Sequence, residues 1–291
     1  MPWLRLSLLT SRAEAERAGE VLERCGAASI SLEESGGERL FETALHEQPL
    51  WAETRVVGLF PPDTSTARIA LELQAALARP APPDLEQELL ADQDWVRAWM
   101  DRWEPQRFGA DVWIVPSWRA APDAAATNII LDPGLAFGTG THATTAMCLE
   151  WIAAHDLRGA RVIDWGCGSG ILAIAALMRG AVSALAVDID PEALTATGDN
   201  AARNGVLDRM TIALPETAPQ IQGDVVFANI LAGPLVQLAP LLCRGVAPDG
   251  ALVLSGLLTR QADEVARAYA AEFALQAQTR EEWAMLWARK N

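Results

Sequence analysis

The sequence of 291 residues predicts an α/β protein in which a mostly parallel sheet, covered by helices on both faces, follows a small α+β domain. Three observations lead to this prediction. From about residue 144 onward, near-continuous apolar runs alternate with helical patterns, as buried parallel strands and their crossover helices do. The last two strand patterns have no helix between them, so they should pair antiparallel. Residues 1–91 instead show two helical patterns among four short strand patterns.

Residues 1–91 are predicted to form a domain of their own. Strand and helix patterns follow in the order β-α-β-β-α-β, over Trp3–Leu9, Ala13–Cys25, Ala28–Leu32, Thr54–Phe60, Thr64–Ala78 and Leu85–Leu90. This order is typical of a ferredoxin-like fold. No group of residues suited to catalysis occurs here, which favours a role in recognition or docking over that of a purely structural appendage.

Residues 92–105 are predicted to form a linker helix. Trp95, Trp99 and Trp103 recur at intervals of four, which places their rings on one side of a helix. We expect these rings to pack against the flanking domains rather than to stack on a ligand. The second domain, residues 106–291, should begin with strands over Arg107–Trp118 and Asn128–Leu131.

The elements of the doubly wound sheet follow in sequence. Helices are predicted over residues 144–154, 169–179, 191–204, 233–245 and 260–270. Strands are predicted over residues 161–165, 183–188, 209–213, 223–229, 250–256, 273–278 and 283–289. The sheet should therefore bind its ligand at the carboxyl ends of the central strands, as open α/β sheets do.

A glycine-rich turn after the strand over 161–165 is the most informative motif of the chain. Residues 164–170 read Asp-Trp-Gly-Cys-Gly-Ser-Gly, and Asp188 ends the next strand. The backbone at Gly166 and Gly168 can approach a ligand closely, and a carboxylate such as Asp188 can accept both hydroxyl hydrogens of a ribose. A dinucleotide fingerprint runs Gly-x-Gly-x-x-Gly, so the spacing here disfavours NAD. The loop predicts a nucleotide pocket in which Asp164 suits a cationic group better than a pyrophosphate.

Composition and charge exclude several classes of function. No apolar stretch approaches the ~20 residues that a membrane helix needs, and the first residues lack a signal-peptide pattern. Four scattered cysteines without a Cys-x-x-Cys pair, and three distant histidines, predict a cytoplasmic protein without a metal site. The net charge of −15 disfavours direct nucleic-acid binding and favours a basic macromolecule as partner, although acidity also serves plain solubility. We expect a monomer.

Two further segments should meet the glycine loop at the carboxyl edge of the sheet. Residues 131–142 read Leu-Asp-Pro-Gly-Leu-Ala-Phe-Gly-Thr-Gly-Thr-His, and residues 224–232 read Asp-Val-Val-Phe-Ala-Asn-Ile-Leu-Ala. Together with Asp94–Trp95 and the Arg-Phe-Gly of residues 107–109, they resemble the PrmA family, the methyltransferases of the large-subunit ribosomal protein L-eleven. The glycine loop by itself marks only the superfamily, whereas the other two segments are much more specific.

The resemblance spans essentially the whole chain and implies a fold, a cofactor and a substrate. It implies a Rossmann-like class I methyltransferase sheet and S-adenosyl-L-methionine as methyl donor. The activity implied is that of a protein-lysine N-methyltransferase, which methylates lysine side chains and the N-terminal α-amine of ribosomal protein L-eleven, gripped by the N-terminal domain. The cofactor contacts carried over are Thr145, Gly166, Asp188 and Asn229, with Phe137 beside the methionine part.

Asn229 is the predicted catalytic residue. A lysine with a pKa of ~10.4 is neutral about once in a thousand near pH 7.4, and only the neutral amine has a lone pair for the methyl group. An amide oxygen can accept an N–H of that amine and orient it, whereas a carboxylate would raise the amine's pKa. The alternative is that Asn229 merely ends a strand. Thr141 or His142 is expected to cap the following helix, and His142 as a general base is the less favoured alternative.

Two rival functions are kept open. A glutamine or adenine-N6 methyltransferase would carry Asn-Pro-Pro-aromatic where this chain has Asn229-Ile230-Leu231-Ala232. A non-catalytic ribosome-assembly factor would bind the cofactor and transfer no methyl group. The group that holds adenine is also left open, because residues 214–216 after the third strand read Leu-Pro-Glu, and either the Glu216 side chain or the backbone can serve.

Overall fold

A computed structural model describes residues 2–35, 51, 53–90, 103–132 and 142–290. The chain divides into two compact units, Met1–Met100 and Asp101–Asn291. The predicted linker helix over 92–105 lies for the most part outside the described residues, and residues 103–105 adopt neither helix nor strand. The predicted site residue Phe137 also lies outside the described residues. Within the described part of the chain, no helix has the length and hydrophobicity needed to span a bilayer.

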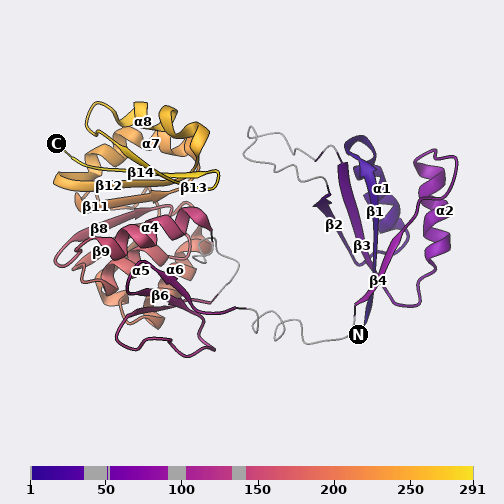
Figure 1. The fold of residues 1–291 in the computed structure, drawn as a ribbon, viewed down its shortest axis with the longest axis horizontal. Coiled ribbons are helices and arrows are strands. Elements are labelled where there is room, and N and C mark those ends of the chain that lie inside the picture. Colours follow the sequence, from indigo (N-terminus) through magenta and orange to yellow (C-terminus); the bar gives the residue numbers. More distant parts are fainter. Residues whose placement is uncertain (1, 36–50, 52, 91–102, 133–141, 291) are drawn as a thin grey trace. The chain divides into compact units, whose positions relative to one another are not determined.

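The first unit is a four-stranded antiparallel sheet with two helices on one face (Figure 1). Its elements are β1 (Trp3–Ser11), α1 (Arg12–Arg24), β2 (Ser29–Glu34), β3 (Glu53–Phe60), α2 (Thr66–Ala76) and β4 (Glu86–Leu90). The strand order β2-β3-β1-β4, with each neighbouring pair antiparallel, is the ferredoxin-like arrangement that the sequence predicts. Leu4, Leu6 and Leu8 of β1 share one core with Leu22 and Ile69 of the helices, because alternate residues of a strand point to the same face.

The second unit begins with a three-stranded sheet and continues as a seven-stranded sheet. Its elements are β5 (Gln106–Phe108), β6 (Val112–Val115), β7 (Thr127–Ile130), α4 (Ala143–Ala154), β8 (Arg161–Trp165), α5 (Ile171–Met178), β9 (Ser183–Val187), α6 (Pro191–Arg203), β10 (Met210–Ala213), β11 (Gly223–Asn229), α7 (Ala232–Gly245), β12 (Val246–Leu258), α8 (Ala262–Tyr269), β13 (Gln276–Arg280) and β14 (Trp283–Arg289). The strand order is β10-β9-β8-β11-β12-β14-β13. As predicted, β13 and β14 pair antiparallel. The chain leaves β8 toward one edge and returns to β11 on the other side, which creates the switch point where such sheets bind ligands.

Two apolar cores lie on the two faces of the large sheet (Figure 1). Helices α4, α5 and α6 cover the face where Val162 and Phe227 are buried. Helices α7 and α8 cover the other face, where Ile163 and Val226 are buried. Because adjacent strand residues point to opposite faces and both faces are covered, most residues of each central strand must be apolar. This requirement explains the continuous apolar runs of the sequence.

Several element boundaries differ from the prediction: β12, for example, covers Val246–Leu258 rather than residues 250–256. Two of the differences have clear local reasons. Helix α5 begins at Ile171 rather than at residue 169, because Gly170 has a φ of 76° and is the N-cap. Strand β13 begins at Gln276 rather than at residue 273, because the backbone amides of Glu272 and Phe273 still donate to the Tyr269 carbonyl at the end of α8. Both differences arise from backbone bonds that close a turn before the next element starts.

Candidate functional site

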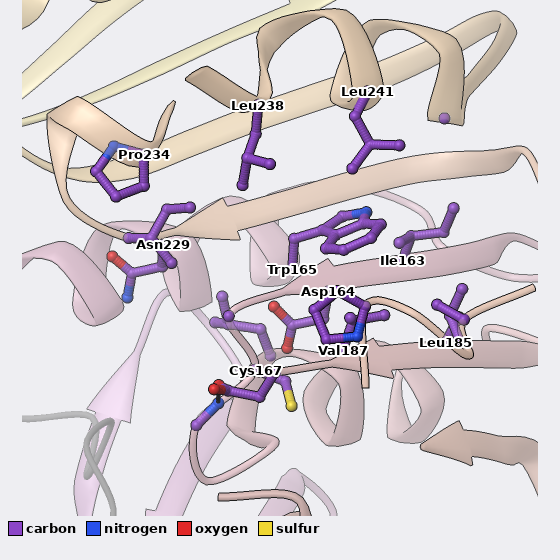
Figure 2. Close-up of a pocket in the computed structure, with 18 of the residues that line it drawn as sticks. Ile163, Asp164, Trp165, Cys167, Leu185, Val187, Asn229, Pro234, Leu238 and Leu241 are labelled. Carbon is purple, nitrogen blue, oxygen red and sulfur yellow. Dashed lines mark hydrogen bonds between the residues drawn. The ribbon is translucent and has the colours of Figure 1, made fainter. Parts of the chain in front are cut away.

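The carboxyl ends of β8, β9 and β11 open into a cavity of about 1300 Å³. The predicted site residues that the structure describes all line it, namely Thr145, Gly166, Gly168, Asp188 and Asn229. They come from α4 and from three separate strand ends, and the switch point of the sheet brings them together. Figure 2 shows Asp164 and Val187 on the sheet side of this cavity, with Asn229 at the end of β11.

The glycine loop turns tightly against the end of β9. The backbone amides of Gly166 and Cys167 both donate to the Val187 carbonyl, at 2.7 and 3.1 Å. Gly166 has a φ of 74°, and a Cβ at this position would collide with the Ile230 side chain. A glycine is therefore required here for both conformation and space. The loop backbone can face the cavity without an intervening side chain at Gly166 or Gly168.

Asp188 holds the glycine loop and also faces the cavity. Its Oδ2 accepts a hydrogen bond from the Gly168 amide at 2.9 Å, and its Oδ1 accepts one from the Asp190 amide at 3.0 Å. A carboxylate has about four acceptor sites, so Asp188 retains capacity for two hydroxyl groups after making these bonds. Its neighbour Ile189 is 82% exposed and lines the cavity, where it offers apolar surface to a planar ring. Sequence reasoning missed Ile189, although an apolar residue directly after a strand-end acid was a usable signal.

Asp164 is a buried acid with one oxygen that lacks a partner. Its Oδ2 accepts a bond from the Ala173 amide at 3.3 Å, whereas its Oδ1 is buried without a hydrogen-bond partner among the described residues. Burial raises the pKa of Asp164 to about 7; the charge of Asp188 also raises it, and the Ala173 amide acts in the opposite direction. A buried unpaired carboxyl oxygen is costly, and a cationic ligand group in the cavity would satisfy it.

Asn229 is fixed by a side chain of α4 and by the neighbouring strand β12. Its Nδ2 donates to Oγ1 of the buried Thr145 at 3.1 Å, so Oδ1 is the polar atom of the side chain left to accept a bond. The next residue, Ile230, donates its amide to the Ser255 carbonyl at 3.1 Å. Gly256 has a φ of 85°, and a Cβ there would collide with the Ile230 backbone. The end of β11 therefore sits against a strand that leaves no room for movement toward it.

His142 is the N-cap of α4. Its Nδ1 accepts from the Thr144 amide at 3.5 Å and lies 2.8 Å from Thr144 Oγ1. The His142 ring meets the Trp283 ring edge to face, with centroids 4.6 Å apart, and both residues line the cavity. Burial lowers the pKa of His142, while Glu282 and Glu281 act to raise it. The structure thus gives His142 the capping role, and Thr141 lies outside the described residues.

The cavity extends past the strand ends along the α7 face of the sheet. Figure 2 shows Leu238 and Leu241 of α7 opposite Trp165 and Ile163. Residues 214–222, between β10 and β11, contain neither helix nor strand, and Pro215 and Glu216 of this connection line the cavity. Sequence reasoning missed this apolar extension, because it depends on where α7 packs rather than on any local motif.

No metal centre is formed by the described residues, because no three of their His, Cys, Asp and Glu side chains are grouped to hold an ion. Cys167 in the glycine loop is buried, and its Sγ lies 3.4 Å from Thr197 Oγ1. Burial raises the pKa of Cys167 to about 12, so its thiol stays protonated and unreactive at neutral pH. Its small size, rather than redox chemistry, explains its place in the loop.

Comparison with known proteins gives a consistent result. The family model described as ribosomal protein L11 methyltransferase (PrmA) matches residues 2–291. A Pseudomonas putida protein named ribosomal protein L11 methyltransferase is 50% identical over 276 residues, 94% of each chain. A Pseudomonas aeruginosa protein of the same name is 49% identical over 293 residues, 100% of this chain and 99% of its own. The crystal structure of ribosomal protein L11 methylase from Lactobacillus delbrueckii subsp. bulgaricus is 36% identical with a TM-score of 0.58, covering 65% of this chain and 100% of that one. The chain therefore belongs to the ribosomal protein L11 methyltransferase (PrmA) family, and its large sheet is a class I methyltransferase sheet.

Proposed function

We propose that this chain transfers methyl groups from S-adenosyl-L-methionine to ribosomal protein L11, at lysine side chains and at the N-terminal α-amine. Family membership supports the reaction type and the protein substrate. The observation that carries the choice of an amine is the amide oxygen of Asn229. Thr145 holds that amide at the wall of a cavity that Asp164 and Asp188 also line.

The residues present fit S-adenosyl-L-methionine. Asp188 offers acceptors for the two ribose hydroxyls, and the unpartnered Oδ1 of Asp164 offers an acceptor for the ammonium group of the methionine part. Ile189 offers an apolar surface for adenine beside Pro215 and Glu216, and Gly166 leaves the loop backbone accessible. When bound, the cofactor supplies an electrophilic methyl group on a sulfonium.

The surroundings of Asn229 favour a neutral amine. Its bonded neighbour Thr145 carries no charge, and Thr144 and His142 at the start of α4 add none at neutral pH, because burial lowers the pKa of His142. These uncharged groups give a protonated amine no ion pair, and the loss of water on entry disfavours its charged form. Asn229 Oδ1 would then accept an amine N–H and orient the nitrogen lone pair.

Residues 1–91 are proposed to recognise the substrate, residues 92–105 to link the two domains, and residues 106–291 to carry the methyltransferase site. The net charge of −15 suits a basic ribosomal protein as partner. On the sheet of the first unit, Arg5 pairs with Glu33 at 2.9 Å and lies 3.7 Å from Glu88, and Arg55 pairs with Glu86. Carboxylates therefore outnumber guanidinium groups in this cluster. A ribosomal protein as substrate favours action in the cytoplasm, and the monomeric state stays a prediction.

The proposal is tested by labelling. The protein is incubated with radiolabelled S-adenosyl-L-methionine and undermethylated ribosomal protein L11, and the labelled residues are located by peptide mapping. We expect label on lysine side chains and on the N-terminal amine, and at least about tenfold slower labelling with Asn229→Ala. Label on glutamine would replace the amine assignment by an amide one. Cofactor binding without transfer to any ribosomal protein would support the non-catalytic assembly factor instead.

A further inference from the structure

Helix α6 holds the glycine loop from the side that faces away from the cavity. Thr197 Oγ1 donates to the Gly168 carbonyl at 2.9 Å, and Asn200 Nδ2 donates to the Ser169 carbonyl at 2.9 Å. Thr197 is fully buried, and a Cβ on Gly170 would come within 2.8 Å of its Cγ2. The third glycine of the loop therefore allows α6 to approach, and two successive loop carbonyls are bound by this helix.

Asn204, the C-cap of α6, binds the outer edge of β7. Its Nδ2 donates to the Ile130 carbonyl at 2.8 Å, and its Oδ1 accepts from the Ile130 amide at 2.8 Å. The side-chain amide thus makes the pair of hydrogen bonds to Ile130 that the backbone of a neighbouring strand would otherwise make. The same Nδ2 also lies 2.9 Å from the Asn200 carbonyl. An unbroken series of hydrogen bonds and covalent links therefore runs from β7 through Asn204 and Asn200 to the glycine loop.

A second connection joins α6 to the end of β7. Arg203 Nη1 donates to Asp132 Oδ2 at 2.9 Å, and Asp132 also accepts from the amide and the hydroxyl of Ser117, at 2.6 and 2.9 Å. This ion pair is partly exposed and contributes little by itself. The ion pair instead constrains geometry, because it fixes the end of β7 against the same turn of α6 that carries Asn204.

From these contacts we propose that Thr197, Asn200 and Asn204 are positioning residues that set cofactor affinity from outside the pocket. None of the three lines the cavity. Thr197 and Asn200 bind the loop carbonyls from the α6 side, and Asn204 ties the end of α6 to β7. Together they hold the loop in the conformation in which the Gly168 amide donates to Asp188. A loop ordered before binding loses less conformational freedom on binding, so affinity rises without a new contact. The inference rests on the proposed cofactor, S-adenosyl-L-methionine.

The test compares matched variants of the full chain. Thr197→Val removes the hydroxyl donor, whereas Thr197→Ser keeps it; Asn200→Ala and Asn204→Ala remove the two amides. Thr195→Val is the control, because Thr195 is exposed on the same helix and its hydroxyl donates only to the Pro191 carbonyl of α6 in the described structure. Dissociation constants for S-adenosyl-L-homocysteine are measured by calorimetry, and kcat and the KM for S-adenosyl-L-methionine are measured with ribosomal protein L11.

We expect Thr197→Val, Asn200→Ala and Asn204→Ala each to weaken binding about three- to tenfold, which is of the order of one net hydrogen bond. kcat at saturating cofactor should stay within about twofold, and Thr197→Ser and Thr195→Val should bind like wild type. The Asn200→Ala/Asn204→Ala double variant should lose less than the product of the single losses, because the two residues share one path. Amide exchange at residues 166–171 of the unliganded protein should accelerate in Asn200→Ala.

The possible outcomes overturn different statements. If the wild type does not bind S-adenosyl-L-homocysteine, the proposed function fails. If the wild type binds and the three variants bind equally well, the positioning role fails while the proposed function stands. A loss of kcat with an unchanged KM would also contradict the inference, because it would place these residues in the chemical step. If a variant melts far below the wild type, amide exchange in Thr197→Ser and Asn200→Ala is measured at low temperature in place of its binding constant. Unchanged loop exchange in Asn200→Ala then counts against the proposal.

Discussion

We expect binding of S-adenosyl-L-homocysteine to strengthen as the pH rises from 6 to 8, because of Asp164. The pKa of this buried carboxyl is raised to about 7, and its Oδ1 has no partner among the described residues. With that pKa, the charged fraction of Asp164 rises from about 0.1 at pH 6 to about 0.9 at pH 8. If the ligand ammonium pairs only with the charged form, the dissociation constant should fall about tenfold over this interval.

The stability of the unliganded protein should change with pH in the opposite sense. The folded-state pKa of Asp164 lies above its value of 3.8 in an unfolded chain, so the folded state binds the proton more tightly. The stabilisation that this provides is fully present below about pH 4 and is lost as the pH rises through 7. Three pKa units correspond to at most about 4 kcal/mol. Asp164→Asn should therefore raise the melting temperature of the unliganded protein at pH 8.

The assay is calorimetry at pH 6, 7 and 8 in two buffers of different ionisation enthalpy, which also counts released protons. Wild type should release about half a proton near pH 7, and Asp164→Asn should bind weakly with no pH slope. His142→Asn is the control, because it keeps an acceptor at the N-cap and removes another titrating group that lines the cavity. A flat wild-type profile, or a slope that survives in Asp164→Asn, would refute the role given to Asp164.

Three further predictions concern the strand ends. Asn229→Ala should keep S-adenosyl-L-homocysteine affinity within a few fold yet lower turnover at least about tenfold, since the amine loses its acceptor; unchanged turnover in the labelling assay would remove Asn229 from the mechanism. Asp188→Ala should weaken ligand binding about tenfold or more, because the ribose and the Gly168 amide both lose their carboxylate acceptor. Wild-type affinity in calorimetry would contradict this. Gly256→Ala should lower the free energy of unfolding by more than about 1 kcal/mol in a denaturant titration and should lower turnover, since its Cβ would meet the Ile230 backbone. The control Gly233→Ala in α7, with open space around it, should be neutral or stabilising. Equal effects of the two substitutions would show that β12 does not position Asn229.

Parts of the site that follow from local sequence were predictable. Gly166 must adopt a positive φ directly after a strand, and Asp188 ends the next strand, so the loop and its acid could be assigned before the structure was known. The amide at Asn229 ends a third strand, and strand order places these ends together. Each of these statements depends on strand periodicity and on the rule that ligands bind at the carboxyl edge of such sheets.

The residues that hold the site in place from a distance were not predictable, because each also has an ordinary local role that accounts for its residue type. Asn204 followed by Gly205 is an ordinary helix stop, and nothing in that pair of residues indicates that the side chain binds Ile130, 74 positions earlier. Thr197 occupies a helical position with no sign that its hydroxyl meets a loop carbonyl 29 residues away. The apolar extension beside Leu238 and Leu241 depends in the same way on how α7 packs against β11 and β12.

The sequence by itself determined the fold class, the two-domain order, the strand ends and the family, because these depend on periodicity and on motifs of adjacent residues. Only the tertiary structure decided the pKa and the orientation of the side chains in the pocket. The raised pKa of Asp164 requires burial by α5 and the charge of Asp188, and the orientation of Asn229 requires the Thr145 hydroxyl from α4. Burial and hydrogen-bond geometry are properties of packed elements, so no stretch of adjacent residues contains them.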